Sequence, residues 1–567
     1  MTSITQLLHT YQDNQKAQDA IRLIEHTSTS VFLTGKAGTG KSTLLKALTQ
    51  YLSKQHIILA PTELAALQVG GENIHSFFGF EWRVYMPEEE NIPPLPPTRV
   101  QLLEEVELIV IDEISMVRCD LMNAIDLSLR QHLKNDRPFG GKQLLMIGDL
   151  YQLPPIIDER NKEEVNLLRS NYTSRYFFSA KAFEQDFQYQ IVELSKVYRQ
   201  KDRKFISLLN AIRVNQMDDN LLATLNERHN VKGGLSSNFK ITLASTNAVI
   251  QELNEEKLAE IEAPLVIFHA EEEGNFANVG SAYPTDKELR LKVGAQVMFV
   301  KDDKPNSIDG KAGRWMSGTI GRVAEISEEQ LWIEIKEGKE MVTYPVEHHT
   351  WHKYIYEWDP NTETVAQKAI GSFTQFPIKL AWGITIHKSQ GQTFDHVIIN
   401  LGRKAFATGQ TYVALSRCTS FKGLTLKRPV SPEDIFVDKR ITKFLEAQKQ
   451  YRADKNSYIT MLEHTERSIQ QQHLIIASLE EKNIQQQQQQ QHLVKTLVEQ
   501  DQRIDWLSTD LEAAKNNLKD NESKLGSTLS ELAARESEVE TALGTKGIYQ
   551  ILLLILSIAL IWALFFK

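Results

Sequence analysis

The chain has very few cysteines for its length and no excess of positive charge. Cys119 and Cys418 are the only two cysteines among 567 residues, which excludes a disulfide framework and indicates a reducing compartment. Lysine and arginine number 64 against 73 acidic residues, a net charge of −9. Because this excludes a broadly basic surface, any nucleic-acid site must be a local groove. The first residues also lack the basic and then apolar run of a secretion signal.

The residues that are present belong to a folded protein of several units. The hydrophobic fraction is 41% and the charged fraction 24%, and 567 residues suffice for three or four structural units. Residues 1 to about 425 alternate short β-rich runs with longer helical stretches, which predicts parallel sheets covered on both faces and hence two α/β lobes. Buried strands are predicted at Val31–Thr34, Ile57–Ala60, Leu108–Ile111, Leu144–Ile147, Ile241–Ala244 and Val397–Asn400.

Composition shifts set the predicted domain limits. Lobe one is placed at residues 1–185, with a small insertion at about 72–100 that contains the stiff, proline-rich segment 91–98. Lobe two is placed at 186–430. Within it, residues 285–370 combine short strands, turn dipeptides and aromatic residues, which predicts a small inserted β-barrel.

After residue 440 a seven-residue repeat replaces this pattern. The repeat predicts a coiled-coil tail over 441–545 and possible self-association through 462–539. The second position of the repeat that should be apolar is less regular, since Gln500 and Asn521 occupy it. The predicted coiled-coil interface is therefore weak. The main row consists of Leu462, Ile469, Ile476, Leu497, Ile504, Leu511, Leu518, Leu525, Leu532 and Val539.

The segment 548–566 is almost wholly apolar. Of its nineteen residues only Tyr549, Gln550 and Ser557 carry polar groups. As a helix it would span roughly 28 Å, close to the roughly 30 Å of a bilayer core. A buried core helix is the alternative, but leucine and isoleucine would coat every face. The sequence therefore predicts a single C-terminal membrane span, with the rest of the chain on the cytosolic side.

A glycine-rich loop follows the first predicted strand and opens a helix. It reads Gly35-Lys-Ala-Gly-Thr-Gly-Lys41-Ser42, the spacing G-x-x-x-x-G-K-S. Backbone N–H groups of such a loop curl around phosphates, the lysine reaches the β/γ oxygens and the serine hydroxyl binds Mg²⁺. The nucleotide-binding residues predicted here are Gly35, Gly38, Thr39, Gly40, Lys41, Ser42 and Thr43.

Two carboxylates at the end of the strand Leu108–Ile111 supply the second half of a nucleotide site. Asp112 is the predicted second ligand of the magnesium, and Glu113 is placed to orient the attacking water. An acidic pair at a strand end is common by itself. Its position about seventy residues after the phosphate-binding loop predicts hydrolysis of a nucleoside triphosphate, with ATP and Mg²⁺ bound.

Three further residues are candidates for contact with the γ-phosphate. Gln152 lies in the run Gly148–Pro155 after another predicted strand. Arg199 and Arg417 are each predicted to come from the far lobe, where a guanidinium stabilises transition-state charge. Without the other motifs, the commoner interpretation of either residue would be an arginine on the surface of a helix.

Several of these strings together resemble one family. Ile111–Val117, Gly148–Pro155, Gln375–Asp395 and Tyr412–Arg417 are similar to the ordered motifs of the Pif-type branch of superfamily-one helicases, relatives of RecD. The likeness covers about residues 10–425. It implies two RecA-like lobes with ATP between them, an SH3-like insertion in lobe two, and 5′-to-3′ travel on single-stranded DNA. Gly383 departs from the usual alanine of that motif, and the tail lies beyond the resemblance.

The resemblance also implies roles for individual residues. Gln18 takes the place of the adenine-reading glutamine, with Gln15 as competitor, and Tyr198 that of the adenine-stacking aromatic; Gly391 would also border the nucleotide. The alternative for both Tyr198 and Phe77 is that they are buried core residues. The implied DNA contacts are Pro61, Thr62, His75, Phe77, His387, Lys388 and Ser389.

The sequence thus predicts an ATP-dependent DNA helicase that acts on single-stranded and duplex DNA and is tethered to a membrane. The alternative is a membrane-tethered, ATP-dependent nucleic-acid-binding switch without processive unwinding.

Overall fold

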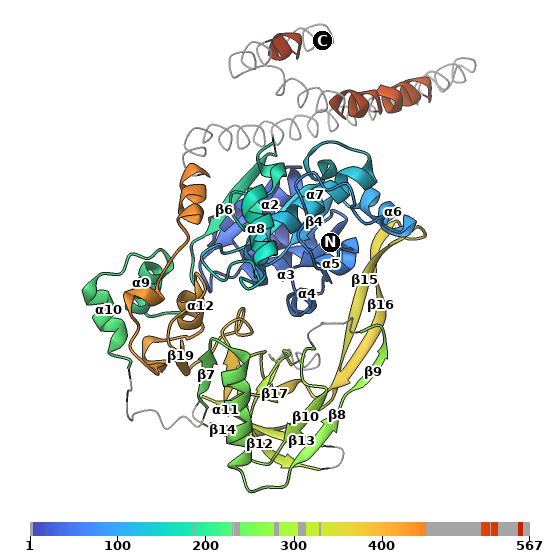
Figure 1. The fold of residues 1–567 in the computed structure, drawn as a ribbon. Helices are drawn as coiled ribbons and strands as arrows, with labels where there is room; N and C mark the ends of the chain where they lie inside the picture. The colour runs from blue at the N-terminus through green and yellow to red at the C-terminus, as the bar shows by residue number, and fades with distance from the viewer. Residues whose placement is uncertain are drawn as a thin grey trace, which may run out of the picture. The chain divides into compact units, whose positions relative to one another are not determined.

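The structure, a computed structural model, describes residues 4–185, 187–229, 231, 239–276, 283–303, 313–327, 330–338, 340–448, 512–521, 523–530 and 554–559 (Figure 1). The chain divides into two compact units, Met1–Tyr451 and Arg452–Lys567. The first unit contains all the predicted nucleotide-binding and DNA-binding residues.

Lobe one is built on a six-stranded, wholly parallel sheet in the order β3-β2-β4-β5-β1-β6. The strands are β1 (Ser30–Gly35), β2 (His56–Ala60), β3 (Glu72–Asn73), β4 (Leu108–Ile111), β5 (Gln143–Gly148) and β6 (Tyr189–Leu194). The helices are α1 (Ile4–Thr10), α2 (Gln15–His26), α3 (Lys41–Tyr51), α4 (Glu63–Val69), α5 (Ile74–Phe78), α6 (Pro97–Glu105), α7 (Cys119–Leu133) and α8 (Lys162–Asn171).

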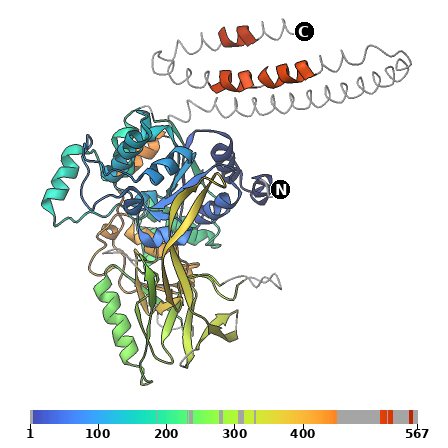
Figure 2. The same cartoon turned by 90° about the vertical axis from the view of Figure 1, so that its right-hand side faces the viewer.

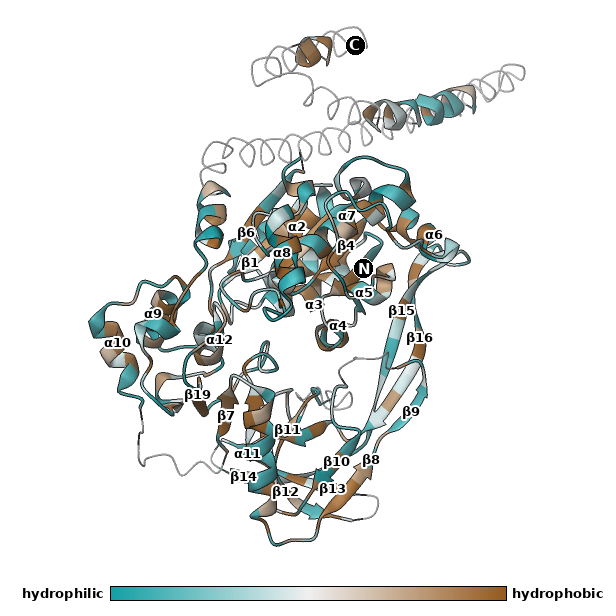
Figure 3. Ribbon diagram, in the orientation of Figure 1, coloured by the Kyte–Doolittle hydropathy of each residue, from teal (hydrophilic) through white to brown (hydrophobic). Residues whose placement is uncertain are grey.

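The central strands of this sheet are apolar over most of their length because both faces are covered. In β1, Val31 and Leu33 point to a core shared with α2 and α3, whereas Phe32 points to a core shared with α6 and α7. Alternate residues of a strand face opposite sides of the sheet, so a strand buried on both sides needs an unbroken apolar run. Figure 3 shows the hydrophobic residues gathered inside lobe one around β4 and α7.

Lobe two has a smaller parallel sheet in the order β18-β7-β19-β20. Its elements are α9 (Arg203–Arg213), α10 (Asp219–Asn226), β7 (Ile241–Ala244), α11 (Asn247–Ala259), β18 (Gly383–Thr385), β19 (Val397–Asn400), α12 (Gln410–Ser416) and β20 (Leu424–Leu426). The predicted strands are all present, and the expectation of two parallel-sheet α/β lobes is confirmed.

The predicted limit of lobe one at residue 185 lies too early. β6 pairs with β1 from Ser30↔Tyr189 to Gly35↔Leu194, so lobe one extends at least to Leu194. The physical reason is that the edge of a sheet is completed by whichever strand can pair with it, and no composition shift marks that strand.

An all-β insertion separates α11 from β18. Its five-stranded antiparallel sheet has the order β14-β13-β12-β11-β17, and its strands run from Val266 to Leu380, so the predicted range 285–370 is too short at both ends. They are β8 (Val266–His269), β9 (Glu271–Gly274), β10 (Glu288–Leu291), β11 (Gln296–Phe299), β12 (Ile320–Ile326), β13 (Leu331–Glu337), β14 (Glu340–Val346), β15 (His349–Asp359), β16 (Thr364–Gln375) and β17 (Ile378–Leu380).

The long hairpin β15–β16 joins this insertion to lobe one, as Figures 1 and 2 show. The Lys353 ammonium group lies 2.9 Å from a Glu63 carboxylate oxygen of α4. The Tyr356 hydroxyl accepts a hydrogen bond from the Ile58 N–H of β2, at 3.1 Å. Local sequence patterns did not predict this contact, because it joins residues almost 300 positions apart.

Residues 439–448 form a helix that packs against lobe one. Phe444 stacks on Phe178 with ring centroids 4.1 Å apart, and Ile441 is buried in the same core. The predicted start of the coiled-coil tail at 441 is therefore wrong, since these apolar residues complete the core of the first unit.

Only parts of the predicted tail lie among the described residues. Residues 512–521 and 523–530 are helical, and Leu518 and Leu525 of the seven-residue row are 66% and 58% exposed. The rest of the row lies outside the described residues, as does most of the predicted span 548–566. Among the residues that the structure describes, no helix has both the length and the apolar character needed to cross a membrane.

Candidate nucleotide and nucleic-acid site

The phosphate-binding loop connects β1 to α3 at the carboxyl edge of the lobe-one sheet. Gly38 and Gly40 have φ angles of 78° and 84°, which glycine adopts most readily. A Cβ atom at Gly38 would also lie 2.6 Å from Cβ of Arg199. Gly38 therefore allows both the left-handed backbone of the loop and the close approach of Arg199.

Lys41 places its ammonium group inside this loop. Its Nζ donates hydrogen bonds to the carbonyl oxygens of Gly35 and Lys36, at 2.7 and 3.3 Å. Burial lowers the pKa of Lys41, because the charged form loses hydration, although Asp149 and Glu113 oppose the shift. An ammonium group held only by carbonyl oxygens can turn to a phosphate oxygen at little cost.

The side chains of the first turn of α3 differ in exposure. Ser42 and Thr43 are exposed, whereas Thr39 is buried and its hydroxyl donates to the Lys36 carbonyl oxygen at 2.8 Å. Ser42 is therefore available to a ligand, and Thr39 holds the shape of the loop.

The two carboxylates follow β4, next to the loop in the sheet. Asp112 is buried, and burial followed by repulsion from Glu113 raises its pKa to about 7. The positive charge of Lys41 opposes this rise without cancelling it. The Asp112 carboxylate and the Ser42 hydroxyl are hard oxygen donors of the kind that Mg²⁺ prefers, so these residues fit the predicted metal.

Glu113 has an unusual backbone and a partner from lobe two. Its φ of 49° is uncommon for a residue with a side chain, and such strain concentrates at functional sites. Its carboxylate accepts a hydrogen bond from Nε2 of Gln390 at 2.9 Å. Burial raises the pKa of Glu113, against the pull of Lys41. Gln390 was not predicted as a site residue, although it lies in the family-like run 375–395.

Arg417 is 1% exposed at the end of α12 and reaches only neutral groups. Its Nε donates to the Val413 carbonyl oxygen at 3.0 Å, and one Nη donates to the Ser416 hydroxyl at 2.9 Å. Burial, and then the charge of Arg199, lower the pKa of Arg417 to about 9. A buried guanidinium without an acidic partner is unfavourable, so this arrangement favours an anionic ligand.

Arg199 lies beside the phosphate-binding loop on the segment that follows β6. The Tyr198 N–H donates to the Gly38 carbonyl oxygen at 2.8 Å, and Arg199 reaches across to Oγ1 of Thr393 at 2.8 Å. Burial lowers its pKa to about 10. The prediction that Arg199 comes from the far lobe is therefore wrong: the residue belongs to the connection after lobe one. Gly391, with a φ of 81°, accepts a hydrogen bond from Arg199 at 3.3 Å.

The two lobes meet directly at this site. The Ala37 N–H of the phosphate-binding loop donates to the Tyr412 hydroxyl of α12, at 2.9 Å. This contact joins one of the loop's backbone donors to the helix that ends at Arg417. A phosphate that took this N–H would therefore release Tyr412 and connect nucleotide binding to the position of lobe two.

An ion pair that sequence patterns missed holds Gln152. Nε2 of Gln152 donates to Asp149 at 3.3 Å, and Asp149 is paired with Arg213 of α9 at 2.8 Å. All three side chains are buried. Burial alone would raise the pKa of Asp149, but Arg213 and Lys41 outweigh that effect and lower it. No local signal marks Arg213, since it is the last residue of an ordinary amphipathic helix.

The predicted adenine side lies between α2 and Tyr198. The Tyr198 ring packs on Gly40: a Cβ atom added to this glycine would lie 3.6 Å from the ring. The Tyr198 hydroxyl accepts a hydrogen bond from Nδ2 of Asn14 at 3.2 Å. Gln18 lies one helical turn after Asn14 and is half-buried, whereas Gln15 is exposed and donates to Asp19. Tyr198 itself is 49% exposed, which excludes the core-tyrosine reading.

Residues 10–221 match the model of the PIF1-like helicases. The ATP-dependent DNA helicase Pif1 of Campylobacter jejuni is 31% identical over 417 residues, which cover 69% of this chain and 87% of that protein. The chain belongs to the PIF1-like helicase family.

Further relatives agree with that membership. Human ATP-dependent DNA helicase PIF1 is 32% identical over 419 residues, or 73% of this chain; the chain spans about 60% of the human protein's length. The structure of Bacteroides Pif1 with ADP-AlF4 is 36% identical, with a TM-score of 0.70 over 77% of this chain and 97% of that one. Bacteroides Pif1 bound to single-stranded DNA is 35% identical, with a TM-score of 0.55 over 78% and 97%.

Most of the DNA contacts implied by the PIF1-like family gather at the carboxyl edges of the two sheets. Ala60 of β2 is registered with Asn73 of β3, so Pro61–Thr62 and His75 follow neighbouring parallel strands. Thr62 accepts a hydrogen bond from the Ala65 N–H at 3.2 Å. In lobe two, His387 and the exposed Lys388 follow β18.

Two of the implied DNA contacts are wrong as direct contacts. Phe77 is 1% exposed and packs against Phe78 in the lobe-one core, so it has no free face for a base. Ser389 is 0% exposed, and its hydroxyl donates to the Ile386 carbonyl oxygen at 2.7 Å. It therefore shapes the loop that carries His387 and Lys388. Phe77 fills the lobe-one core and Ser389 is buried within its own loop. The motifs specify the type of these residues but do not show that they are buried.

Proposed function

We propose that this chain is an ATP-dependent DNA helicase that moves 5′ to 3′ on single-stranded DNA. The observation that carries the ATP-hydrolysing part of the proposal is the pair of guanidinium groups, Arg199 and Arg417, which have no ion-pair partner among the described residues. The direction rests on the family resemblance. Membership of the PIF1-like family and the names of its relatives support the choice of DNA.

Each residue of the site has a role in ATP hydrolysis. Lys41 and the backbone of Gly38–Ser42 bind the β- and γ-phosphates. Glu113, turned by its left-handed backbone toward Gln390, holds the attacking water and accepts its proton. Arg417 neutralises the charge that develops on the γ-phosphate. Ser42 and Asp112 would hold Mg²⁺, which neutralises phosphate charge when bound.

The same contacts couple hydrolysis to movement. While the γ-phosphate is present it attracts the guanidinium groups of lobe two and the connection, so the lobes close. When the phosphate leaves, these two guanidinium groups keep only neutral hydrogen-bond partners, and the lobes reopen. Alternating grip of the two DNA-binding edges then gives net stepping along one strand.

Strand displacement on duplexes with a 5′ or a 3′ single-stranded overhang tests this proposal. We expect unwinding only from the 5′ overhang, with ATP and Mg²⁺. Preference for the 3′ overhang would refute the direction. DNA-stimulated ATP hydrolysis without displacement from either substrate would favour the ATP-dependent switch.

We further propose that residues 548–566 span a membrane and leave residues 1–547 on the side that holds ATP and DNA. The apolar run and its length support this. The seven-residue repeat over 462–539 would then form a coiled coil that separates the motor from the bilayer and pairs two chains.

Fractionation of cell lysates tests the span. Full-length protein should sediment with membranes and need detergent for release, whereas a chain ending at Lys546 should be soluble. Lysines in place of Leu554 and Ile558 should also release the protein, since each costs roughly 3 kcal/mol in a bilayer core. The matched control places lysines at Leu518 and Leu525 and should remain on the membrane. Release of the full-length chain by salt alone would disprove the span.

A further inference from the structure

Trp82 is the most exposed large apolar side chain of the described residues, at 79%. Its indole lies against the imidazole of His75, with ring centroids 3.9 Å apart and planes within 16°. Burial lowers the pKa of His75 to about 4, so the imidazole is neutral at pH 7 and packs as a flat ring. One face of the indole is supported, and the rest remains in contact with solvent.

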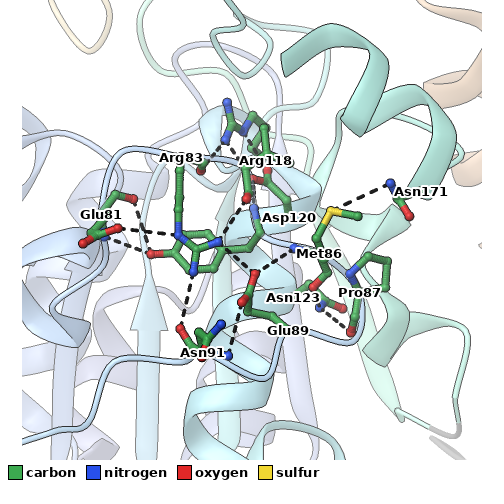
Figure 4. A network of polar contacts seen from close by, with 12 residues as sticks. Glu81, Arg83, Met86, Pro87, Glu89, Asn91, Arg118, Asp120, Asn123 and Asn171 are labelled. Atoms are coloured by element: carbon green, nitrogen blue, oxygen red, sulfur yellow. Dashed lines mark hydrogen bonds and ion pairs between the residues drawn. The ribbon is translucent and has the colours of Figure 1, made fainter. Parts of the chain in front are cut away.

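The loop that carries Trp82 has no regular secondary structure, yet side chains hold it in place (Figure 4). Arg83, the next residue, pairs with Glu89 at 2.8 Å. Its carbonyl oxygen accepts from Arg118 at 3.0 Å, and the Tyr85 N–H donates to Asp120 at 3.1 Å. These contacts fix the backbone that directly follows the exposed indole.

Lobe two also has an exposed aromatic residue near a histidine, at a larger separation. Phe406 is 61% exposed and lies parallel to His387, with planes within 16° and centroids 6.3 Å apart. Its loop is fixed as well: the Phe406 N–H donates to Gln410 at 2.9 Å, and the Ala405 N–H donates to Asp434 at 3.0 Å. Gln410 and Asp434 are both buried.

The positions of the two pairs are equivalent within their lobes. His75 follows β3 and His387 follows β18, so each pair lies beyond the carboxyl end of a parallel strand. That is the edge at which Thr62 and Lys388 also lie. An aromatic face beside groups suited to phosphate contact is the arrangement that binds unpaired bases without regard to sequence.

We infer that Trp82 and Phe406, each beside a histidine, are two base-stacking platforms, one in each lobe, for the unpaired bases of single-stranded DNA. The inference rests on the proposed function, because it names the residues through which that motor grips its substrate. Trp82 grips through lobe one and Phe406 through lobe two, so the two platforms change their separation whenever the lobes open or close.

Alanine substitution at each platform tests the inference. Trp82→Ala and Phe406→Ala should each weaken binding to a thymidine oligonucleotide about 5- to 150-fold, measured by fluorescence anisotropy. Trp82→Phe should recover most of the loss, because it restores an aromatic face. Met341→Ala, an exposed apolar residue of β14, is the matched control and should bind as the unaltered chain does.

An abasic oligonucleotide of the same length separates stacking from other effects. It keeps the phosphates and lacks the bases, so the unaltered chain and both alanine variants should bind it equally. Weaker binding of the abasic strand by the variants would overturn the inference, as would unchanged binding to the thymidine strand. Thermal unfolding of the variants should match that of the unaltered chain and shows that they are folded.

A crosslinking experiment on the unaltered chain does not depend on how the variants fold. Irradiation with DNA that carries 5-iodouracil should yield crosslinked peptides containing Trp82 and Phe406; crosslinks at neither residue would overturn the inference. If the unaltered chain bound no single-stranded DNA, the proposed function itself would fail. If it bound and unwound DNA while these substitutions had no effect, only the stacking platforms would be wrong.

Discussion

Replacing Lys41 with alanine is expected to lower ATP hydrolysis by about 10³-fold or more while the protein stays folded. Its ammonium group donates hydrogen bonds to the carbonyl oxygens of Gly35 and Lys36, so its loss breaks no ion pair. In the presence of ATP the same group contacts the β- and γ-phosphates, and losing a preorganised donor of this kind costs about 10²–10³-fold even when it is neutral. Phosphate release from the purified variant is the measurement.

Lys46→Ala is the matched control for this substitution. Lys46 lies on the same helix, α3, and is exposed, so its loss changes the net charge equally but leaves the phosphate-binding loop intact. Normal turnover in the Lys41 variant would show that the loop does not bind the phosphates that are cleaved.

Arg417→Ala should retain nucleotide binding but lose about 10³–10⁵-fold of the DNA-stimulated turnover, the range for an arginine that neutralises the transition state. The guanidinium is buried beside neutral acceptors, so its removal leaves no acidic group unpaired. Single-turnover hydrolysis, together with equilibrium binding of a fluorescent ATP analogue, separates the chemical step from affinity.

Two comparisons sharpen the Arg417 experiment. Arg417→Lys keeps the charge but loses the planar fork, so most of the defect should remain. Arg290→Ala, an exposed arginine of β10, should behave as the unaltered chain. A loss smaller than about tenfold in Arg417→Ala would place the guanidinium away from the γ-phosphate; the same substitution at Arg199 shows whether both arginines share the task.

Local patterns predicted the parts of the fold that depend on neighbouring residues. The strands around Phe32 and Val110 were predictable because a strand covered on both faces must be apolar throughout. The phosphate-binding loop and the acidic pair at Asp112 were predictable because backbone conformation and metal chemistry restrict which residues can stand there.

The features that were missed depend on contacts between distant residues. Arg213 reaches Asp149 from a helix 64 positions away, and β15 reaches lobe one across almost 300 residues. Phe444 belongs to the lobe-one core although lobe two lies between them in sequence. The motif around Phe77 specifies an aromatic residue but not the direction of its ring, which only the packing of the core decides.

Single-turnover strand displacement tests most directly the claim that this chain converts ATP hydrolysis into separation of DNA strands. The protein is bound to a duplex with a 5′ overhang, and the reaction starts on addition of Mg²⁺ and ATP with excess single-stranded DNA to prevent rebinding. Strand separation is predicted with ATP and none with a non-hydrolysable analogue. Separation with the analogue, or ATP hydrolysis at full rate without any separation, would contradict the claim.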